Sequence, residues 1–375
     1  MKVGIVTITD GQNYGNRLQN YALQAVLCDL GLEVETLKRR TSRDKSLFCN
    51  IEFFIKQIIK RIVGRKDTQF ARLCRKRRFN SFNKEYISFS SYVLHDNVAP
   101  RDLSAKYDYF VCGSDQIWNA RFDIVKEDIK NNLAFFASEE QRIAYAASFG
   151  TKDIANGYED LFRDELKKFK SIGVREEEGK RIVSELCNRK DVKVVIDPTI
   201  MLTQEQWKRI EKKPKYIKEG ERFIVSYVIS EDNKKLKDYI SDIANQYNAR
   251  IIKLSVEFLA DDRVVNRDFF CTMPNEFIWL ISHAECVLTD SYHASIFSIL
   301  FHKPFICYKR KAIEVGNDMG SRIENLLKMF DLVDFIDDID EPIKKPRQFD
   351  EKNVELIQER QRKVALLFLK DAIGI

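Results

Sequence analysis

The 375-residue sequence lacks the segments that mark a membrane-spanning or fibrous protein. No stretch approaches the ~18 uninterrupted apolar residues that a transmembrane helix needs. The apolar run at Lys2–Thr7 is too short for a signal peptide and leads directly into a polar loop. We therefore expect a cytoplasmic protein whose first strand lies at this run. Proline and glycine are scarce, with 7 and 14 residues, and we find no repeat or low-complexity segment.

Signatures of metal and nucleotide binding are also missing. The four histidines do not cluster, and no two of the eight cysteines stand at C-x-x-C spacing, so we expect buried, reduced thiols and no metal. The chain has no G-x-x-x-x-G-K-[ST], H-E-x-x-H, G-x-S-x-G or G-x-G-x-x-G. These absences argue against P-loop ATPases, zinc proteases, α/β-hydrolases and standard dinucleotide-binding enzymes. We expect no cofactor.

Positive charge is concentrated in one segment. Residues 38–78 hold 15 Lys or Arg and 3 Asp or Glu, whereas the whole chain carries a net charge of only +6. Within this segment, Ile51–Val63 is apolar on a wide face with cations beside it. Such a helix could lie on the anionic inner face of the plasma membrane, or pack on its own domain. No nucleic-acid module accompanies the charge, so no nucleic-acid partner is expected.

Buried strand-like runs alternate with helical patterns along the chain, which predicts an α/β protein with mostly parallel sheets. A charged connection after Asp197-Pro198 divides the pattern in two. We expect a Rossmann-like domain at residues 1–200, with a basic helical insert at about 45–84. A second Rossmann-like domain at 201–375 would end in an amphipathic helix that could cross back to the first. Two such domains with a cleft between them give a GT-B-like architecture.

In open α/β sheets, ligands bind where strands lead into helices, and helix N-termini attract anions. The first polar junction follows the strand at Lys2–Thr7. Gly15 permits close approach of a ligand, and Asn13, Asn16 and Arg17 offer donors at the start of the next helix. The alternative is an ordinary capped loop.

A second polar junction follows the strand at Tyr109–Cys112. It presents Gly113, Ser114, Asp115 and Gln116 in succession. Asp115 could act as a base or orient a sugar hydroxyl. Equally, Ser114 and Asp115 could serve only to cap the helix that follows.

In the third junction, Ser291 is a good N-cap, and Tyr292 and His293 fall in the first turn of the following helix. An imidazole beside a helix N-terminus suits proton exchange with an anionic substrate, although a histidine is more often structural. Arg175 directly follows a strand, and Arg322 opens a helix; either could hold a carboxylate or phosphate. Arg175 could instead pair with the neighbouring glutamates.

Six short motifs occur in the order in which one family has them. They are Asn13–Leu23, Gly113–Asn119, Ala144–Gly150, Val174–Glu176, Asp197–Thr199 and Thr289–Ala294. Together they cover most of the chain, which resembles the polysaccharide pyruvyl transferase family.

The resemblance implies transfer of pyruvate from phosphoenolpyruvate to two hydroxyls of one sugar, forming a ketal. The acceptor would belong to a capsular polysaccharide, exopolysaccharide or other cell-surface glycan, carried as a lipid-linked oligosaccharide. His293 would be the acid/base, Arg175 the anion clamp, and Asp115 the group that positions or deprotonates the acceptor. Some members have Arg where this chain has Ser291, so Arg322 or the Ser291 hydroxyl is expected to compensate.

Two other functions stay open on the residues alone. A nucleotide-sugar glycosyltransferase could share the two-domain architecture, because fold does not settle chemistry. A non-catalytic subunit of a glycan-assembly complex is the second alternative.

Overall fold

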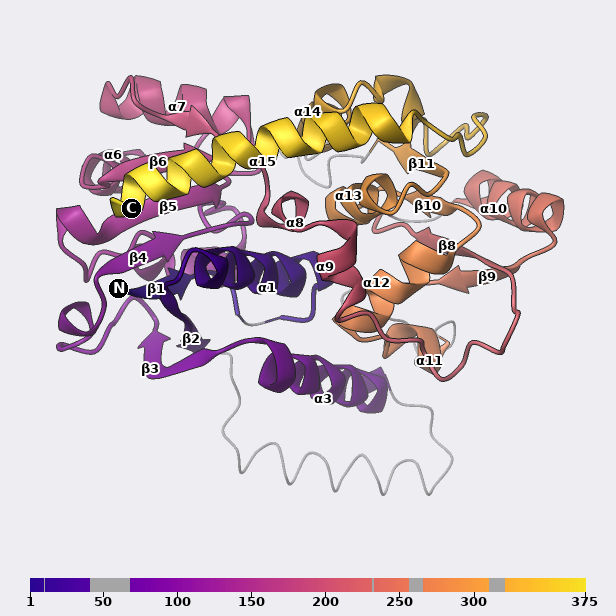
Figure 1. Cartoon of the computed structure of the whole chain (residues 1–375), viewed down its shortest axis with the longest axis horizontal. Coiled ribbons are helices and arrows are strands. Elements are labelled where there is room, and N and C mark those ends of the chain that lie inside the picture. The colour runs from indigo at the N-terminus through magenta and orange to yellow at the C-terminus, as the bar shows by residue number, and fades with distance from the viewer. Residues whose placement is uncertain (10, 41–67, 231–232, 256–265, 310–320) are drawn as a thin grey trace.

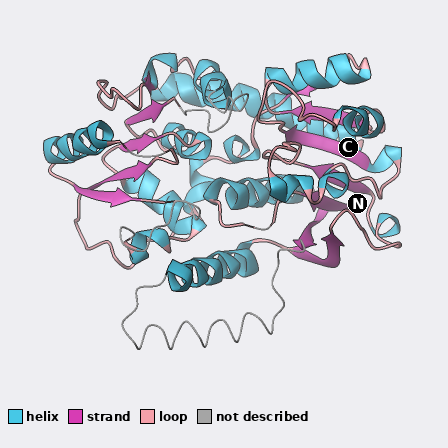
Figure 2. Ribbon diagram, turned by 180° about the vertical axis from the view of Figure 1, so that it is seen from behind, coloured by secondary structure: helices cyan, strands magenta, loops and turns pink. Residues whose placement is uncertain are grey.

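Two parallel sheets lie side by side in the computed structural model, which describes residues 1–9, 11–40, 68–230, 233–255, 266–309 and 321–375 (Figure 1). Helices lie in front of and behind the strands when the molecule is seen from either side (Figure 2). Sheets covered on both faces require strands that are buried throughout, and β5 and β8 are buried at every position.

The first sheet has seven strands in the order β3-β2-β1-β4-β5-β6-β7, and every neighbouring pair is parallel. Its strands are β1 (Lys2–Val6), β2 (Glu33–Arg40), β3 (Phe89–His95), β4 (Tyr109–Cys112), β5 (Arg142–Ala147), β6 (Ser171–Val174) and β7 (Lys193–Val194). The strand order reverses between β1 and β4. This is the point at which Rossmann-like sheets open a crevice for ligands.

The second sheet has five parallel strands in the order β12-β11-β10-β8-β9. They are β8 (Phe223–Tyr227), β9 (Arg250–Lys253), β10 (Val287–Thr289), β11 (Phe305–Tyr308) and β12 (Ile336–Asp337). Here the order reverses between β8 and β10, so the loop after β10 stands at the equivalent crevice.

Helices connect the strands of both sheets. They are α1 (Tyr14–Asp29), α3 (Thr68–Tyr86), α4 (Asp123–Lys126), α5 (Ile129–Asn132), α6 (Glu159–Leu166), α7 (Glu177–Cys187), α8 (Pro198–Met201), α9 (Gln204–Lys208), α10 (Lys234–Tyr247), α11 (Arg267–Phe270), α12 (Pro274–His283), α13 (Tyr292–Leu300), α14 (Ser321–Met329) and α15 (Glu351–Ile373). Among the described residues, none of these is long and apolar enough to cross a membrane.

An apolar core is continuous between the two sheets. The Tyr14 ring of α1 stacks on Phe277 of α12 at 4.5 Å between ring centroids, and its edge meets Tyr227 of β8 at 5.6 Å. Arg75 of α3 is fully buried beside them and donates to the Gln12 and Phe270 carbonyls. These contacts fix the first turn of α1 against the second sheet.

Helix α15 runs from the second sheet back across the first, and the C-terminus lies near β5 (Figure 1). Gln358 Nε2 donates to the Ile200 carbonyl at 2.8 Å and to the Leu202 carbonyl at 3.1 Å. Further along, the Phe368 ring lies so close to Gly173 of β6 that a Cβ there would be 2.9 Å from it. The tail therefore joins the two sheets.

Several cations of the basic segment face the protein. Arg39 is buried and pairs with Asp128 at 2.9 Å, and Arg78 donates to both carboxylate oxygens of Glu276. The expected helical insert coincides with α3 over residues 68–84, whereas residues 45–67, including Ile51–Val63, lie outside the described residues. Membrane contact stays a prediction, and flotation with anionic vesicles is its direct measurement.

Candidate active site

The first junction leads from β1 into α1, and its side chains mostly hold the junction itself. Asn13 is the N-cap of α1 and accepts from the Asn16 backbone N–H at 3.2 Å. Arg17 is buried and donates to the carbonyls of Thr9 and Gly11 at 2.5 and 2.7 Å. Its guanidinium thus faces back onto the loop that precedes it.

The second junction meets the first at the reversal between β1 and β4. Asn16 Nδ2 donates to Asp115 Oδ2 at 3.3 Å, and Ser114 N–H donates to Gln19 Oε1 at 3.0 Å. At Gly113 the φ angle is +129°, and a Cβ would lie 2.0 Å from the Tyr145 carbonyl oxygen. Only glycine fits there, so the turn that presents Asp115 depends on it.

The third junction, after β10, carries the imidazole. The Asp290 carboxylate accepts from the backbone N–H groups of Ile229 and Ser230 at 2.6 and 2.8 Å, which ties the loop after β10 to the loop after β8. Ser291 caps α13 by accepting from the Ala294 N–H. His293 follows in the first turn of the helix and is only 7% exposed.

Gly15 of α1 and His293 of α13 are in direct contact across the two sheets. A Cβ added at Gly15 would lie 1.9 Å from His293 Nδ1, which is far inside van der Waals distance. The absence of a side chain at Gly15 therefore makes room for the imidazole. The N-termini of α1 and α13, each carrying partial positive charge, converge on this ring.

Asp197 lies at the centre of the site and is fully buried. One of its oxygens, Oδ1, accepts from the backbone N–H and hydroxyl of Thr199 at 3.0 and 2.7 Å. The other, Oδ2, accepts from Ser114 Oγ and Arg175 Nη1, both at 3.0 Å, and lies 3.7 Å from His293 Nε2. A single carboxylate thus links groups from both sheets.

The charges around Asp197 keep it ionised. Burial alone would raise the pKa of Asp197, but His293, Arg175 and the Thr199 N–H lower it well below its usual range. For Arg175 the effects are reversed. Burial acts to lower its pKa, but Tyr292, Glu176, Asp197 and Asp115 together raise the pKa above its ordinary value. Both groups therefore remain charged at neutral pH.

Several buried nitrogens of the site lack a hydrogen-bond partner in the described part of the chain, among them one of Arg175 and one of His293. Within the described residues, neither Arg175 Nη2 nor His293 Nε2 has a hydrogen-bond partner. Arg175 is 5% exposed and forms ion pairs with Asp197, with Asp115 at 3.9 Å and with Glu176 at 3.5 Å. Buried donors in proteins are nearly always satisfied, so these two nitrogens are available to donate to a substrate.

The Tyr292 ring lies near two guanidinium groups. The Arg175 Cζ is 4.7 Å from the centre of its ring and the Arg322 Cζ is 5.9 Å away. With its amide oxygen turned toward Arg322, Gln116 accepts from Arg322 Nη1 at 3.1 Å. Burial raises the pKa of Tyr292 despite the two cations, so its hydroxyl stays protonated. Among the described residues, no group of three or more potential ligands forms a metal site.

This arrangement can be compared with known proteins. The sequence model of the family described as polysaccharide pyruvyl transferase matches residues 13–311. The chain belongs to this family. No curated protein sequence matches it. The match confirms the resemblance that the six ordered motifs indicate, and with it a transferase.

Solved structures were also found that are similar to this pyruvyl transferase family member. UDP-GlcNAc 2-epimerase from Methanocaldococcus jannaschii is 14% identical, with a TM-score of 0.50, and the alignment covers 96% of this chain and 99% of that one. The Neisseria meningitidis enzyme of the same name is 11% identical (TM-score 0.42; 97% and 100% covered). E. coli ADP-heptose LPS heptosyltransferase II is 8% identical (TM-score 0.37; 98% and 99%). The first likeness agrees with the two parallel sheets, and the GT-B-like prediction is confirmed.

The structure brings most of the expected site residues of this family member together. Ser114, Arg175 and His293 lie around the Asp197 carboxylate. Asn16 binds Asp115, Gly15 contacts His293, and Arg322 lies near the Tyr292 ring. Arg17 and the exposed N-cap Asn13 act on their own junction instead.

Asp197 is the residue that reasoning from the sequence passed over. In the sequence its Asp-Pro-Thr motif marks the end of the first half of the strand and helix pattern, but the motif also follows a strand and caps a helix, α8. That fourth junction between a strand and a helix was the available signal. Gln19, which accepts from the Ser114 N–H, lies inside α1 and has no such signal in the sequence.

Proposed function

We propose that the chain transfers pyruvate from phosphoenolpyruvate to two hydroxyls of one sugar residue, forming a cyclic ketal and releasing phosphate. The bond between C2 and the phosphate oxygen breaks, and two bonds from C2 to sugar oxygens form. One hydroxyl proton ends on C3, which becomes a methyl group, and the other on phosphate. The observation that carries this proposal is that Arg175 Nη2 and His293 Nε2 are buried without a hydrogen-bond partner among the described residues, in a site where the imidazole lies against the first turn of α1.

The donor carries a carboxylate and a phosphate, and the site offers positive groups for both. Arg175 Nη2 can take the carboxylate, because Nη1 already holds the guanidinium against Asp197. The phosphate can bind at the N-terminus of α13, where Ser291 is the N-cap. Arg322, which lies near the Tyr292 ring, can add a positive charge there. These groups fit a small enol ester that carries both a carboxylate and a phosphate.

His293 supplies the proton in this mechanism. Protonation of C3 by the imidazolium makes C2 an oxocarbenium-like electrophile, which the first sugar hydroxyl attacks. The carboxylate of Asp197, 3.7 Å from Nε2, stabilises the imidazolium and orients the ring. Asp115 is partly exposed and bound by Asn16, and it positions or deprotonates the hydroxyl of a sugar, which we propose belongs to a lipid-linked oligosaccharide of a cell-surface glycan.

Donor consumption tests the proposal. The purified chain should release phosphate from phosphoenolpyruvate only when a sugar with a free diol is present, and phosphoenolpyruvate should raise its unfolding temperature, since ligands stabilise the folded state. UDP-GlcNAc with the same sugars is the matched control. Release of UDP without release of phosphate would favour the glycosyltransferase alternative. If neither donor is consumed and neither raises the unfolding temperature, the alternative of a non-catalytic subunit would be favoured.

Asp197→Asn should change how stability depends on pH. The pKa of Asp197 is below its ordinary value in the folded chain, so its ionised form favours folding. This contribution to stability is fully present above about pH 4, which is the ordinary pKa of an aspartate in the unfolded chain. It is lost as the pH falls toward the lower pKa that Asp197 has in the folded chain. We expect the variant to be less stable by about 3 kcal/mol at pH 7, as for a broken buried ion pair, and the gap to narrow below pH 4.

Urea unfolding of both proteins between pH 7 and pH 3 measures the two profiles. All other carboxylates are shared, so the difference isolates Asp197. Asp160→Asn is the control, because Asp160 pairs with Arg163 at the surface, where ion pairs contribute little. If the free energies of unfolding of wild type and Asp197→Asn change with pH in the same way, the pKa of Asp197 is not lowered by folding.

A further inference from the structure

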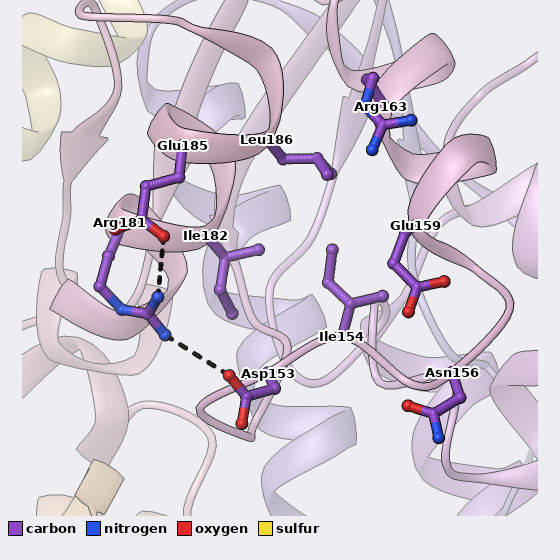
Figure 3. A pocket seen from close by; sticks show the side chains of 9 residues that line it. All are labelled: Asp153, Ile154, Asn156, Glu159, Arg163, Arg181, Ile182, Glu185 and Leu186. Carbon is purple, nitrogen blue, oxygen red and sulfur yellow. Dashed lines mark hydrogen bonds and ion pairs between the residues drawn. The ribbon is translucent and has the colours of Figure 1, made fainter.

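A pocket of about 520 Å³ opens between α6 and α7, outside the site around Asp197 (Figure 3). Its volume is in the range of small-ligand sites. Figure 3 shows Ile182 and Leu186 of α7 facing Ile154 from the loop after β5, with Glu159 and Arg163 of α6 beside them. The pocket thus combines an apolar floor with polar sides.

The loop after β5 connects this pocket to the candidate active site. At its start, the Gly150 N–H donates to Ser148 Oγ and to Glu176 Oε1, next to Arg175. A Cβ at Gly150 would lie 1.9 Å from the side-chain amide of Gln116, so the loop begins against the crevice. A few residues later it lines the pocket with Asp153, Ile154 and Asn156.

The charges of the pocket disfavour an anionic ligand. Arg181 is already paired with Glu185 at 2.9 Å and with Asp153 at 3.8 Å, and Arg163 is paired with Asp160. Glu159 accepts from the Gly157 N–H through one oxygen. What remains are carboxylate acceptors, the exposed Asn156 amide and aliphatic surface. Sugar hydroxyls can donate to the former, and the C–H face of a sugar ring can pack on the latter.

We propose that this pocket is an acceptor subsite, which binds an uncharged sugar unit of the glycan next to the unit that receives pyruvate. The loop of residues 148–158 would guide the chain from the crevice to the pocket. This inference rests on the proposed function, because it assigns a second contact for the same acceptor. It predicts that a long acceptor binds better than a single sugar.

Asn156→Trp tests the subsite, because Asn156 is an exposed loop residue whose enlargement would fill the pocket. The acceptors are the methyl glycoside and the homotetrasaccharide of whichever sugar supports phosphate release, beginning with galactose. For the tetrasaccharide we expect KM to rise at least about tenfold, from the loss of one to two hydrogen bonds. The KM values for the methyl glycoside and phosphoenolpyruvate, and kcat, should stay unchanged.

Two further variants sharpen the experiment. Asn156→Ala should raise the tetrasaccharide KM by only a few fold, as the loss of one hydrogen bond would. Asn245→Trp, the same substitution at an exposed position of α10, should leave both acceptors unaffected. Equal KM values of wild type for both acceptors, or a rise for both in Asn156→Trp, would overturn the subsite. Failure of wild type to consume phosphoenolpyruvate with any sugar would instead overturn the proposed function.

Discussion

Replacing His293 with alanine should lower phosphate release from phosphoenolpyruvate by about 10²- to 10⁴-fold, the usual contribution of a general acid. His293 is the one histidine that lies in the crevice; its Nε2 is buried, 3.7 Å from Asp197 Oδ2 and without a hydrogen-bond partner among the described residues. Tyr292 has a raised pKa and Asp197 a lowered one, so neither of these two neighbours is a good proton donor near neutral pH. The measurement is kcat/KM for phosphoenolpyruvate at a saturating acceptor concentration.

His283→Ala is the matched control. This imidazole is exposed and stacks on Trp279 within α12, away from Asp197, so its loss should leave kcat/KM unchanged. A shift in unfolding temperature with phosphoenolpyruvate separates lost chemistry from lost binding. A His293→Ala protein that folds normally and releases phosphate at the wild-type rate would remove the acid from the mechanism.

Most helices and strands of this fold could be predicted because their signals are local. The strand Tyr109–Cys112 has the expected bounds, and the strand expected at Lys2–Thr7 ends one residue earlier, at Val6. The edge strands β3 and β12 were missed. β3 is mostly exposed or half-buried, so it lacks the apolar run of a central strand, and β12 has only two residues.

The site was harder to predict, because it depends on contacts between distant segments. Three polar junctions could be recognised from strand ends and capping residues, and topology then places their loops at the carboxyl edges of the two sheets. The direction of a side chain is not visible in such a pattern. Arg17 has the same local signal as a ligand-binding arginine, yet the carbonyls of its own loop take up its guanidinium. The contact between Gly15 and His293 spans 278 positions and leaves no local trace.

The contact between Gly15 and His293 leads to a second prediction. Gly15→Ala should lower activity strongly, although it leaves every proposed catalytic side chain in the sequence unchanged. The new Cβ would lie 1.9 Å from His293 Nδ1, so the imidazole or the first turn of α1 must move. A displacement of about 1 Å at a catalytic group can cost ~10²-fold in rate, and we expect a fall of that order in kcat/KM. Gly15 does not have a positive φ, and alanine favours a helix over glycine by about 1 kcal/mol, so α1 itself should tolerate the change.

Gly179→Ala is the control for this variant. It makes the same substitution in helix α7, where the nearest atom to the new Cβ is 3.3 Å away in Val174, and its activity should stay near that of wild type. Because Gly15→Ala acts through the imidazole, the Gly15→Ala/His293→Ala double variant should be no slower than His293→Ala alone. A double variant that is ~10²-fold slower still would mean that Gly15 contacts the substrate directly, and a fully active Gly15→Ala protein would mean that His293 need not occupy its present position.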